Sequence, residues 1–310
     1  MKKVIMDVDT GIDDALGIML AIRSGVLDVL GITTVNGNVS LEAATLNTMK
    51  ILEFLQADPG IGVYPGASRP LLRRPHFEHR VHGEDGLGGA LPDMIPSNRS
   101  RSETYGPDFI IRQARRHPGE ITLIATGPLT NVAIAVSNYP GIVHDLKEVI
   151  VMGGATGTYG NVTPTAEYNM YVDPEAAKLV LEAGFPRLAL VGLDVTRKAL
   201  LTDGDIGAIG DTAIARYVRD STRDYMRRYR ERNGVDACAM HDPLAVGMAI
   251  WPELYETKRY FVDVETKSKL CDGQTVCDVQ NRLGREPNVD VCLRADSGEF
   301  IRRFIEVLRD

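Results

Sequence analysis

Short apolar runs alternate along the chain with segments in which apolar residues recur every three or four positions. Runs rich in Val and Ile are typical of buried parallel strands, and the longer spacing is typical of helices packed on a sheet. Six such runs predict strands, within residues 2–9, 26–35, 61–66, 120–127, 147–154 and 187–196. The pattern predicts an α/β protein with an open, mostly parallel central sheet and helices on both faces.

Two helices between these runs have recognisable ends. Ser40 is a predicted N-cap for the amphipathic segment 41–55. Asp173 is a predicted cap for the next helix, with Pro174 at its first position and Gly184 after its end.

The last third of the chain has a less regular pattern. We predict a long charged helix near 205–232, a short helix after Asp242, two or three strands and a closing helix from Ser297. The chain contains no internal repeat, low-complexity tract or linker, so we predict one domain over residues 1–310.

Composition limits the functions that fit this fold. The chain is 44% hydrophobic, enough for a sizeable core, and its formal charge of −7 gives no global attraction for nucleic acid or an anionic membrane. It has no apolar run near the roughly 20 residues of a membrane span and no signal-peptide pattern. We therefore predict a cytoplasmic protein that binds a small molecule.

The four cysteines match no zinc or redox spacing. They are Cys238, Cys271, Cys277 and Cys292. In a reducing compartment these residues are expected to be free thiols.

Polar motifs follow most of the predicted strands. They read "DVDTGIDD" (7–14), "TTVNGN" (33–38), "ATGPLTN" (125–131) and "VMGG" (151–154). Ligands of open α/β sheets bind beyond the carboxyl ends of the strands, so these motifs mark the expected site. A loop motif, "HGEDGLGG" from His82, and "MHDP" from Met240 add further polar groups.

The first motif places four carboxylates within eight residues: Asp7, Asp9, Asp13 and Asp14. A helix N-terminus stabilises an acid by only about 0.3–1 kcal/mol, too little to compensate four charges. Either some of the acids are protonated or a cation lies among them. Oxygen donors without a Cys or His cluster favour Ca²⁺ or Mg²⁺ over Zn²⁺. The alternative is that Asp13 and Asp14 only cap the helix.

Other metal and nucleotide motifs fit less well. An EF-hand starting at Asp7 would need oxygen ligands where the chain has Gly11 and Ile18. A phosphatase of the haloacid dehalogenase type also has D-x-D after its first strand, but it gives no role to Asp13, Asp14 or "MHDP". No G-x-G-x-x-G follows a strand, and no P-loop motif occurs.

The ordered motifs resemble the inosine/uridine-preferring nucleoside hydrolase family. "DVDTGIDDA", "TTVNGN", "HGEDGLGG", "ATGPLTN", "VMGG", "AEYNMYVDPEAA" and "MHDP" cover nearly the whole chain. The resemblance implies a Rossmann-like core and a Ca²⁺-dependent hydrolase that splits ribonucleosides into base and ribose. Family members are usually dimers or tetramers, so we predict a homo-oligomer.

The resemblance also implies roles for individual residues. Asp9, Asp14, the carbonyl group of Thr126 and Asp242 would bind Ca²⁺, and Asp9 would also be the general base, with Asp7 as support behind them. The expected ribose contacts are Asp13, Asn169, Asn38, Met152 and, at the 5′-hydroxyl, Glu167 and Asn161. His82 and His241 would lie around the base, and His241 is the candidate acid for the leaving group.

The chemistry suits these residue types. Cleavage of an N-glycosidic bond passes through an oxocarbenium-like transition state, which carboxylates stabilise. Ca²⁺ acidifies water weakly, so a carboxylate base is needed beside it. The leaving base needs a proton or a hydrogen bond, and a histidine that titrates near neutrality is a suitable donor.

The charged segment near 205–232 interleaves arginines with tyrosines. Although this mixture occurs on nucleic-acid-binding surfaces, the interspersed acids and the acidic chain favour a solvated helix. Tyr225 and Tyr229 are four residues apart, so they share one helical face and are candidates to stack on the base.

Two departures from the family pattern bear on base selectivity. The chain has Asn36 where relatives often carry a small apolar residue, and "HGED" where they often have "HGES" or "HGEN". A calcium-bound protein that senses nucleosides remains a third function class, beside the hydrolase and the phosphatase.

Overall fold

The central element of the fold is an eight-stranded sheet. We describe residues 1–309 in a computed structural model of the chain. The strands in spatial order are β3 (Gly62–Pro65), β2 (Leu27–Thr34), β1 (Lys2–Val8), β4 (Thr122–Ala125), β5 (Glu148–Met152), β6 (Leu188–Val191), β12 (Val289–Ala295) and β9 (Tyr255–Tyr260). All neighbouring pairs are parallel except β12 and β9. The predicted open, mostly parallel sheet is confirmed.

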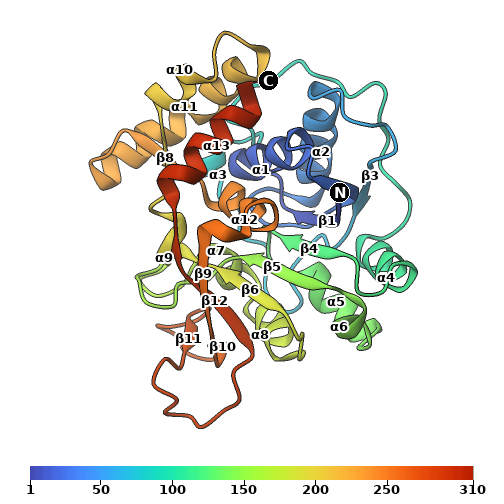
Figure 1. Cartoon of the computed structure of the whole chain (residues 1–310), viewed down its shortest axis with the longest axis vertical. Helices are drawn as coiled ribbons and strands as arrows, with labels where there is room; N and C mark the ends of the chain where they lie inside the picture. The colour runs from blue at the N-terminus through green and yellow to red at the C-terminus, as the bar shows by residue number, and fades with distance from the viewer. Residues whose placement is uncertain (310) are drawn as a thin grey trace.

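The sheet separates two hydrophobic cores. Side chains alternate across a strand, and Val4 and Met6 of β1 accordingly lie in one core while Ile5 lies in the other. Figure 1 shows the helices arranged in two layers on either side of the sheet. One layer contains α1 (Ile12–Arg23), α2 (Leu41–Phe54), α11 (Ala213–Asn233), α12 (His241–Ile250) and α13 (Ser297–Arg309). The other contains α4 (Gly106–Arg116), α5 (Thr130–Asn138), α6 (Ile142–Asp145) and α8 (Pro174–Glu182).

The predicted helix caps are present. The Ser40 hydroxyl accepts the Ala43 N–H at the start of α2, and the Asp173 carboxylate accepts the Ala176 N–H at the start of α8. Gly184, two residues after α8, has a φ of +86°, a conformation that favours glycine. These local signals were sufficient to place both helices.

The sixth predicted strand is too long. The run 187–196 forms β6 only to Val191, and its last four residues form α9 (Leu193–Thr196). β6 pairs with β5 as far as Met152 opposite Val191, where β5 itself ends. After Gly192 the chain turns into a helix.

The last third of the chain also differs from its prediction. The expected helix at 205–232 is two helices, α10 (Asp203–Ala208) and α11, separated by Gly210 at a φ of +97°. Instead of two or three strands, the described part of the region has six. Besides β9 and β12 they are β7 (Leu200–Thr202), β8 (Ala237–Ala239), β10 (Val262–Val264) and β11 (Thr275–Cys277). Three-residue strands are too short for their alternation to be read.

The remaining elements are short and lie in connections. They are α3 (His79–His82), α7 (Tyr168–Val172) and a 3-10 turn at Pro252–Leu254. The motif that begins at His82 was predicted as a loop, but His82 is the last residue of α3, whose turn closes onto Gly83.

The strand order 3-2-1-4-5-6 reverses between β1 and β4, and ligands of doubly wound sheets bind at such a reversal. Asp7 is paired in register with Ala125 across these strands. Asp9 and Thr126 therefore leave the sheet side by side at its carboxyl edge.

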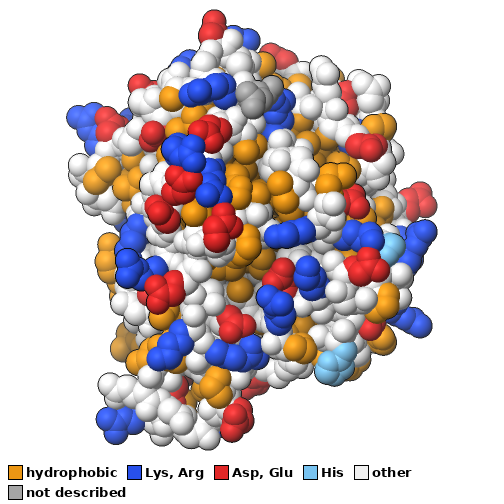
Figure 2. Space-filling view, viewed as in Figure 1, with side chains coloured by type: hydrophobic (Ala, Val, Ile, Leu, Met, Phe, Trp, Pro, Cys, Tyr) orange, Lys and Arg blue, Asp and Glu red, His pale blue; other side chains and the backbone are white. Residues whose placement is uncertain are grey.

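The surface carries charges of both signs. Figure 2 shows basic and acidic side chains interspersed on the face it presents. Among residues 1–309, no helix combines the length and apolar character needed to cross a membrane. The four cysteines are free thiols, as predicted.

Candidate active site

Three carboxylates meet where α1 packs against α12. Asp13 and Asp14 lie in the first turn of α1, and Asp242 is the second residue of α12. One oxygen of each lies within 4.8 Å of those of the other two, and all three side chains are buried. The tertiary fold thus unites the "DVDTGIDD" and "MHDP" motifs.

Asp9 is fully buried between two backbone turns. Its Oδ2 accepts the Asn38 N–H at 2.6 Å, while its Oδ1 has no hydrogen-bond partner. A Cβ atom on Gly37 would lie 2.0 Å from Oδ2, and one on Gly127 would lie 3.0 Å from Oδ1. Both glycines are needed for this close approach, a requirement that the sequence analysis missed although it singled out both motifs.

Asp14 is the most extensively bonded acid of the group. It accepts the Gly11 N–H at 2.9 Å, the Asn38 amide at 3.2 Å and the Thr126 hydroxyl at 2.8 Å. It therefore ties together the ends of β1, β2 and β4.

The charge of the cluster is not compensated by cationic side chains. Among the described residues, no Lys or Arg pairs with these acids, and the nearest candidate cation is the His82 ring, 3.8 Å from Asp13. Burial and mutual repulsion raise the pKa values of Asp9 and Asp242 well above the usual range, and that of Asp13 to about 7. The Asp13 Oδ1 atom, like Asp9 Oδ1, lacks a donor. Unpaired, buried, oxygen-only groups are suited to a hard divalent cation.

Asp7 lies within the sheet, in β1. Its Oδ1 accepts hydrogen bonds from Asn131 at 2.7 Å and Thr33 at 2.5 Å, and burial raises its pKa to about 7. Asn131, another residue that the sequence analysis missed, also bonds to the carbonyl group of Thr34. Among the described residues, the Asp7 carboxylate therefore bonds only to side chains of the sheet edge, and its supporting role stays a prediction.

Asn169 connects the ends of β4 and β5. Its Nδ2 donates to the carbonyl oxygens of Thr126 at 2.7 Å and Met152 at 3.2 Å. The Thr126 carbonyl, a predicted metal ligand, therefore lies beside two predicted ribose contacts. Both Asn169 and Met152 are buried at this edge of the sheet.

Glu167 caps α7. Its carboxylate accepts the backbone N–H groups of Asn169, Met170 and Gly154 at 3.0–3.2 Å, and burial raises its pKa. Asn161 precedes it in the same connection, with a buried Oδ1 that has no donor. Of these two predicted ribose contacts, Asn161 has the freer polar atom.

His82 is a buried, neutral residue. Its Nδ1 accepts the Ile12 N–H at 3.0 Å, so it caps α1. Burial, and then the charges of the neighbouring His241 and His79, lower its pKa to about 3. Since Nδ1 is an acceptor, the ring proton is on Nε2.

His241 lies at the first position of α12, with Nδ1 2.8 Å from the Thr196 hydroxyl. Burial and then the charge of Arg197 lower its pKa to about 4. The expectation of a histidine titrating near neutrality is therefore wrong for both His82 and His241, because the fold buries the His82 ring and partly buries the His241 ring beside Arg197. Each is a neutral N–H donor at pH 7.

Tyr225 and Tyr229 lie on one face of α11, as predicted, with ring centroids 6.1 Å apart in an edge-on arrangement. Tyr225 is buried and its hydroxyl approaches the Ala239 carbonyl at 3.4 Å. The charge of Asp13, after burial, raises the pKa of Tyr225, which places this tyrosine near the acids.

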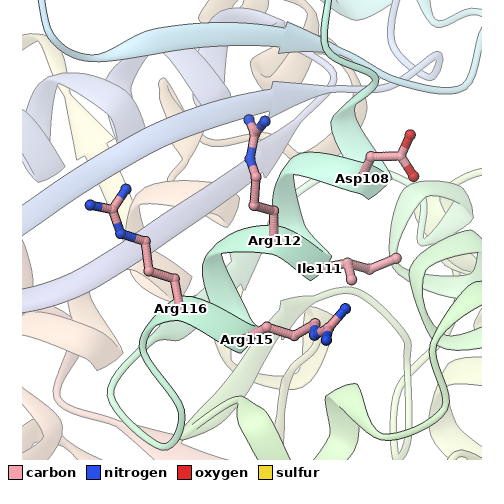
Figure 3. Close-up of a pocket in the computed structure, with 5 residues that line it drawn as sticks. All are labelled: Asp108, Ile111, Arg112, Arg115 and Arg116. Atoms are coloured by element: carbon pink, nitrogen blue, oxygen red, sulfur yellow. The ribbon is translucent and has the colours of Figure 1, made fainter.

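A separate hollow of about 510 Å³ lies over α4 (Figure 3). Its lining residues are Asp108, Ile111, Arg112, Arg115 and Arg116, all from this helix, and Arg112 and Arg116 project from one side of it. It contains none of the predicted site residues. The chemistry of the acid cluster, rather than the volume of this hollow, identifies the candidate site.

The fold and the site together define a doubly wound α/β protein with an acidic site where the strand order reverses. A sequence model of the family described as inosine-uridine preferring nucleoside hydrolase matches residues 4–302. The chain belongs to this family.

Individual relatives agree with this assignment. The pyrimidine-specific ribonucleoside hydrolase RihB of Escherichia coli is 35% identical over 302 residues, which cover 96% of this chain and 94% of the relative. A plant nucleoside hydrolase, PpNRh1, superposes with a TM-score of 0.92 at 34% identity, covering 99% of this chain and 98% of that one. A purine-preferring ribonucleoside hydrolase from Gardnerella vaginalis gives 0.92 at 30% identity, with the same coverage.

This protein is therefore an enzyme of the ribonucleoside hydrolase class, which cleaves the N-glycosidic bond, as the sequence predicted. The family assignment favours this reaction over the two alternatives, a phosphatase and a nucleoside sensor.

Proposed function

We propose that the chain hydrolyses ribonucleosides to free base and ribose with a Ca²⁺ ion held by Asp9, Asp14, Asp242 and the Thr126 carbonyl group. The observation that carries this proposal is the buried cluster of Asp13, Asp14 and Asp242, with Asp9 close enough to repel it. The four acids have no Lys or Arg partner among the described residues, and Asp9 Oδ1 and Asp13 Oδ1 have no donor. When bound, Ca²⁺ supplies the missing positive charge and accepts enough oxygen ligands for water and ribose hydroxyls besides the protein atoms.

Asp9 is the proposed general base. Its Oδ2 is held by the Asn38 N–H, which leaves Oδ1 free to accept a proton from the attacking water. Burial raises its pKa, and a more basic carboxylate is a better proton acceptor.

Asp13 and Asn169 are the proposed contacts of the ribose diol. Asp13 has an oxygen without a donor, and Asn169 is oriented by two backbone carbonyls so that its own Oδ1 stays available. Asn38 and Met152 would lie beside the sugar. The carboxylates nearby would stabilise positive charge as the oxocarbenium-like state develops.

Asn161 and Glu167 are the proposed contacts of the 5′-hydroxyl. Asn161 offers its unpartnered Oδ1, whereas Glu167 already accepts three backbone N–H groups. Asn161 is therefore the main candidate.

His241 is the proposed donor to the leaving base, with His82 as a further contact. Since the pKa of each imidazole is lowered, both would act as neutral N–H donors. Tyr225 and Tyr229 would form a wall for the base.

Ribose release from purine and pyrimidine ribonucleosides, measured by a reducing-sugar assay, tests the proposal. We expect release that stops on chelation and returns with Ca²⁺ more than with Mg²⁺ or Zn²⁺. The relatives are named for opposite base preferences, so the ranking within the panel assigns the preference of this chain. Activity that survives chelation would refute the metal role, and phosphate release from p-nitrophenyl phosphate without ribose release would refute the reaction.

We also propose a cytoplasmic homo-oligomer, a dimer or a tetramer. This rests on the composition and the family resemblance. Light scattering after size-exclusion chromatography measures the oligomeric state, and a monomer would contradict it.

A further inference from the structure

The short helix α9 contacts two separate parts of the candidate site. It follows β6 directly, and Arg197 comes next in the chain. Three side chains of this segment, Asp194, Thr196 and Arg197, bond outside it. None of them was singled out by the sequence analysis.

Asp194 and Arg197 bind the two ends of residues 156–160, which lie in the connection between β5 and α7. The Asp194 carboxylate accepts the N–H groups of Thr156 and Gly157 at 2.9 and 2.7 Å. The Arg197 guanidinium donates to the carbonyl oxygens of Tyr159 and Gly160, both at 2.7 Å. Residues 156–160 are thus bound through four backbone groups.

Arg197 is itself held in place. The Tyr159 ring lies 4.0 Å from its guanidinium carbon, and the Thr158 hydroxyl accepts a further hydrogen bond at 3.3 Å. A planar guanidinium can make these bonds together, whereas the ammonium group of lysine cannot reproduce the fork.

Asn161 follows this bound segment directly. Its side-chain Oδ1 accepts no hydrogen bond, so the side-chain oxygen is not held by any other group. Its backbone N–H donates to Ala166, and the preceding carbonyl is the one that Arg197 holds. Arg197, together with the Ala166 carbonyl and Arg232, therefore holds the backbone that carries the Asn161 amide.

Thr196 orients His241, which belongs to the second part of the candidate site that α9 contacts. Its hydroxyl lies 2.8 Å from Nδ1, which fixes the plane of the ring and leaves Nε2 as the nitrogen free for substrate.

We propose that the segment Asp194–Arg197 is a positioning unit for the hydrolysis reaction: Asp194 and Arg197 place Asn161 at the ribose 5′-hydroxyl, and Thr196 orients His241 toward the leaving base. This proposal rests on the proposed function of the site. It adds three residues that act through others and touch no substrate themselves.

Arg197→Met tests the first arm of the proposal, the placement of Asn161, by comparing two substrates. The ribonucleoside that the panel ranks first is compared with its 5′-deoxy analogue. We expect kcat/KM to fall about tenfold for the ribonucleoside and to change less than about twofold for the analogue, because one substrate hydrogen bond is lost. Asn161→Ala should give the same pattern, and the double variant should be no worse than either.

Arg259→Met is the matched control. Arg259 also donates to backbone carbonyls, those of Pro186, Pro287 and Asn288, but it lies on β9 at the far edge of the sheet. The Arg259→Met variant should leave the ratio of the kcat/KM values for the two substrates unchanged. Equal losses on both substrates in Arg197→Met, or no loss on either, would overturn the positioning role.

Hydrogen exchange provides a readout that needs no activity. In Arg197→Met, the amides of residues 156–162 should exchange at least about tenfold faster, while those of the central sheet should not change. Unchanged exchange in this segment would also overturn the first arm.

Thr196→Val and Thr196→Ser test the second arm. Valine keeps the shape without the hydroxyl, so nucleoside hydrolysis should fall about tenfold. Hydrolysis of p-nitrophenyl riboside should fall less than about twofold, because its leaving group needs no proton, and serine should restore the nucleoside rate. Equal losses on both substrates, or no loss, would overturn this arm. Absence of ribose release by the unmodified protein would instead refute the proposed function, which separates the two failures.

Discussion

The acids at the end of β1 and the tyrosines of α11 belong to one candidate site, but the protein holds them in different ways. We call Asp9, Asp13, Asp14 and Asp242 the floor, and Tyr159, Tyr229 and Arg232 the rim. All four floor residues are buried, and Asp9 and Asp14 are held by backbone N–H groups and neighbouring side chains. At the rim, Tyr159 is 64% exposed, and Arg232 reaches across to the Asn161 carbonyl through one bond of 3.3 Å.

This difference in burial suggests that the floor determines reactivity and the rim determines selectivity. Charge buried in a rigid setting is suited to stabilising a transition state, because no reorganisation is needed as the reaction proceeds. Long side chains on an exposed helix adapt to the shape of a ligand at little cost. Changes in the floor should therefore alter kcat, and changes at the rim should alter KM.

Asp9→Asn should have the largest effect. An amide keeps the size of the side chain but cannot accept the proton of water, so we expect kcat to fall by about 10³-fold. The fold should persist, and in chelator the melting temperature should rise because one buried repelling charge is removed. Steady-state kinetics and thermal denaturation check both parts; activity within tenfold of the unmodified protein would contradict the role of Asp9.

Gly37→Ala should damage the floor without changing any polar group. Its Cβ would lie 2.0 Å from Asp9 Oδ2, so Asp9 or the backbone must shift, at a cost of about 1–3 kcal/mol. We expect lower stability in chemical denaturation and a fall in kcat of about 10²-fold.

Gly207→Ala is the control for this substitution. Gly207 lies in α10 with no atom within 4 Å of an added Cβ. Alanine there should stabilise the protein by about 0.5–1 kcal/mol and leave kcat unchanged. Equal kinetics in the two variants would show that the close approach at Asp9 is unimportant.

The pH dependence of stability in chelator also reports on the floor. The pKa of Asp13 is about 7 in the folded chain, against about 3.9 when unfolded, and those of Asp9 and Asp242 are also raised. The folded chain binds the protons of these acids more tightly than the unfolded chain does. The resulting contribution to stability is complete below about pH 4 and is lost as the pH rises through about 7.

We expect the melting temperature in chelator to be lower at pH 8 than at pH 5, on the order of 5 °C. Added Ca²⁺ should raise it more at pH 8 than at pH 5. A protein that is more stable at pH 8 in chelator would contradict the uncompensated cluster, and Asp13→Asn should weaken the pH dependence.

Tyr229→Ala should act on binding. Loss of one ring beside the base should raise KM about tenfold on every active nucleoside and change kcat less than threefold. Tyr139→Ala is the control, because Tyr139 is likewise a partly buried tyrosine but lies beside Arg115 on the opposite layer of helices. Unchanged kinetics in Tyr229→Ala would remove the proposed wall.

Arg223→Ala should have the smallest effect. Arg223 pairs with Asp220 on the exposed side of α11, where solvent screens both charges. We expect a melting temperature within about 1 °C and no change in kinetics. Measurable binding of a single-stranded RNA oligonucleotide that this variant weakens would contradict the solvated-helix interpretation.

The sequence was most informative where the determining interactions are local. The caps at Ser40 and Asp173 follow from side chains that bond within three residues, and the apolar runs predict buried strands wherever both faces are covered. The acids of β1 and α1 predicted a cation site because repulsion among charges so close in sequence persists in any fold.

The tertiary structure determined which distant groups meet. No local pattern predicts that α12 brings Asp242 to Asp14, that His82 caps α1 or that the pKa values of both histidines are lowered. The helix α9 follows the point where the pairing of β5 with β6 ends, and it places Arg197 against residues 158–160. Hydrogen bonds between segments far apart in the chain depend on the packing of the whole sheet, whereas caps and apolar periodicity depend only on neighbours. The sequence by itself therefore determined the sheet, the family and the acids, and the tertiary structure decided how those acids and their supporting side chains are held.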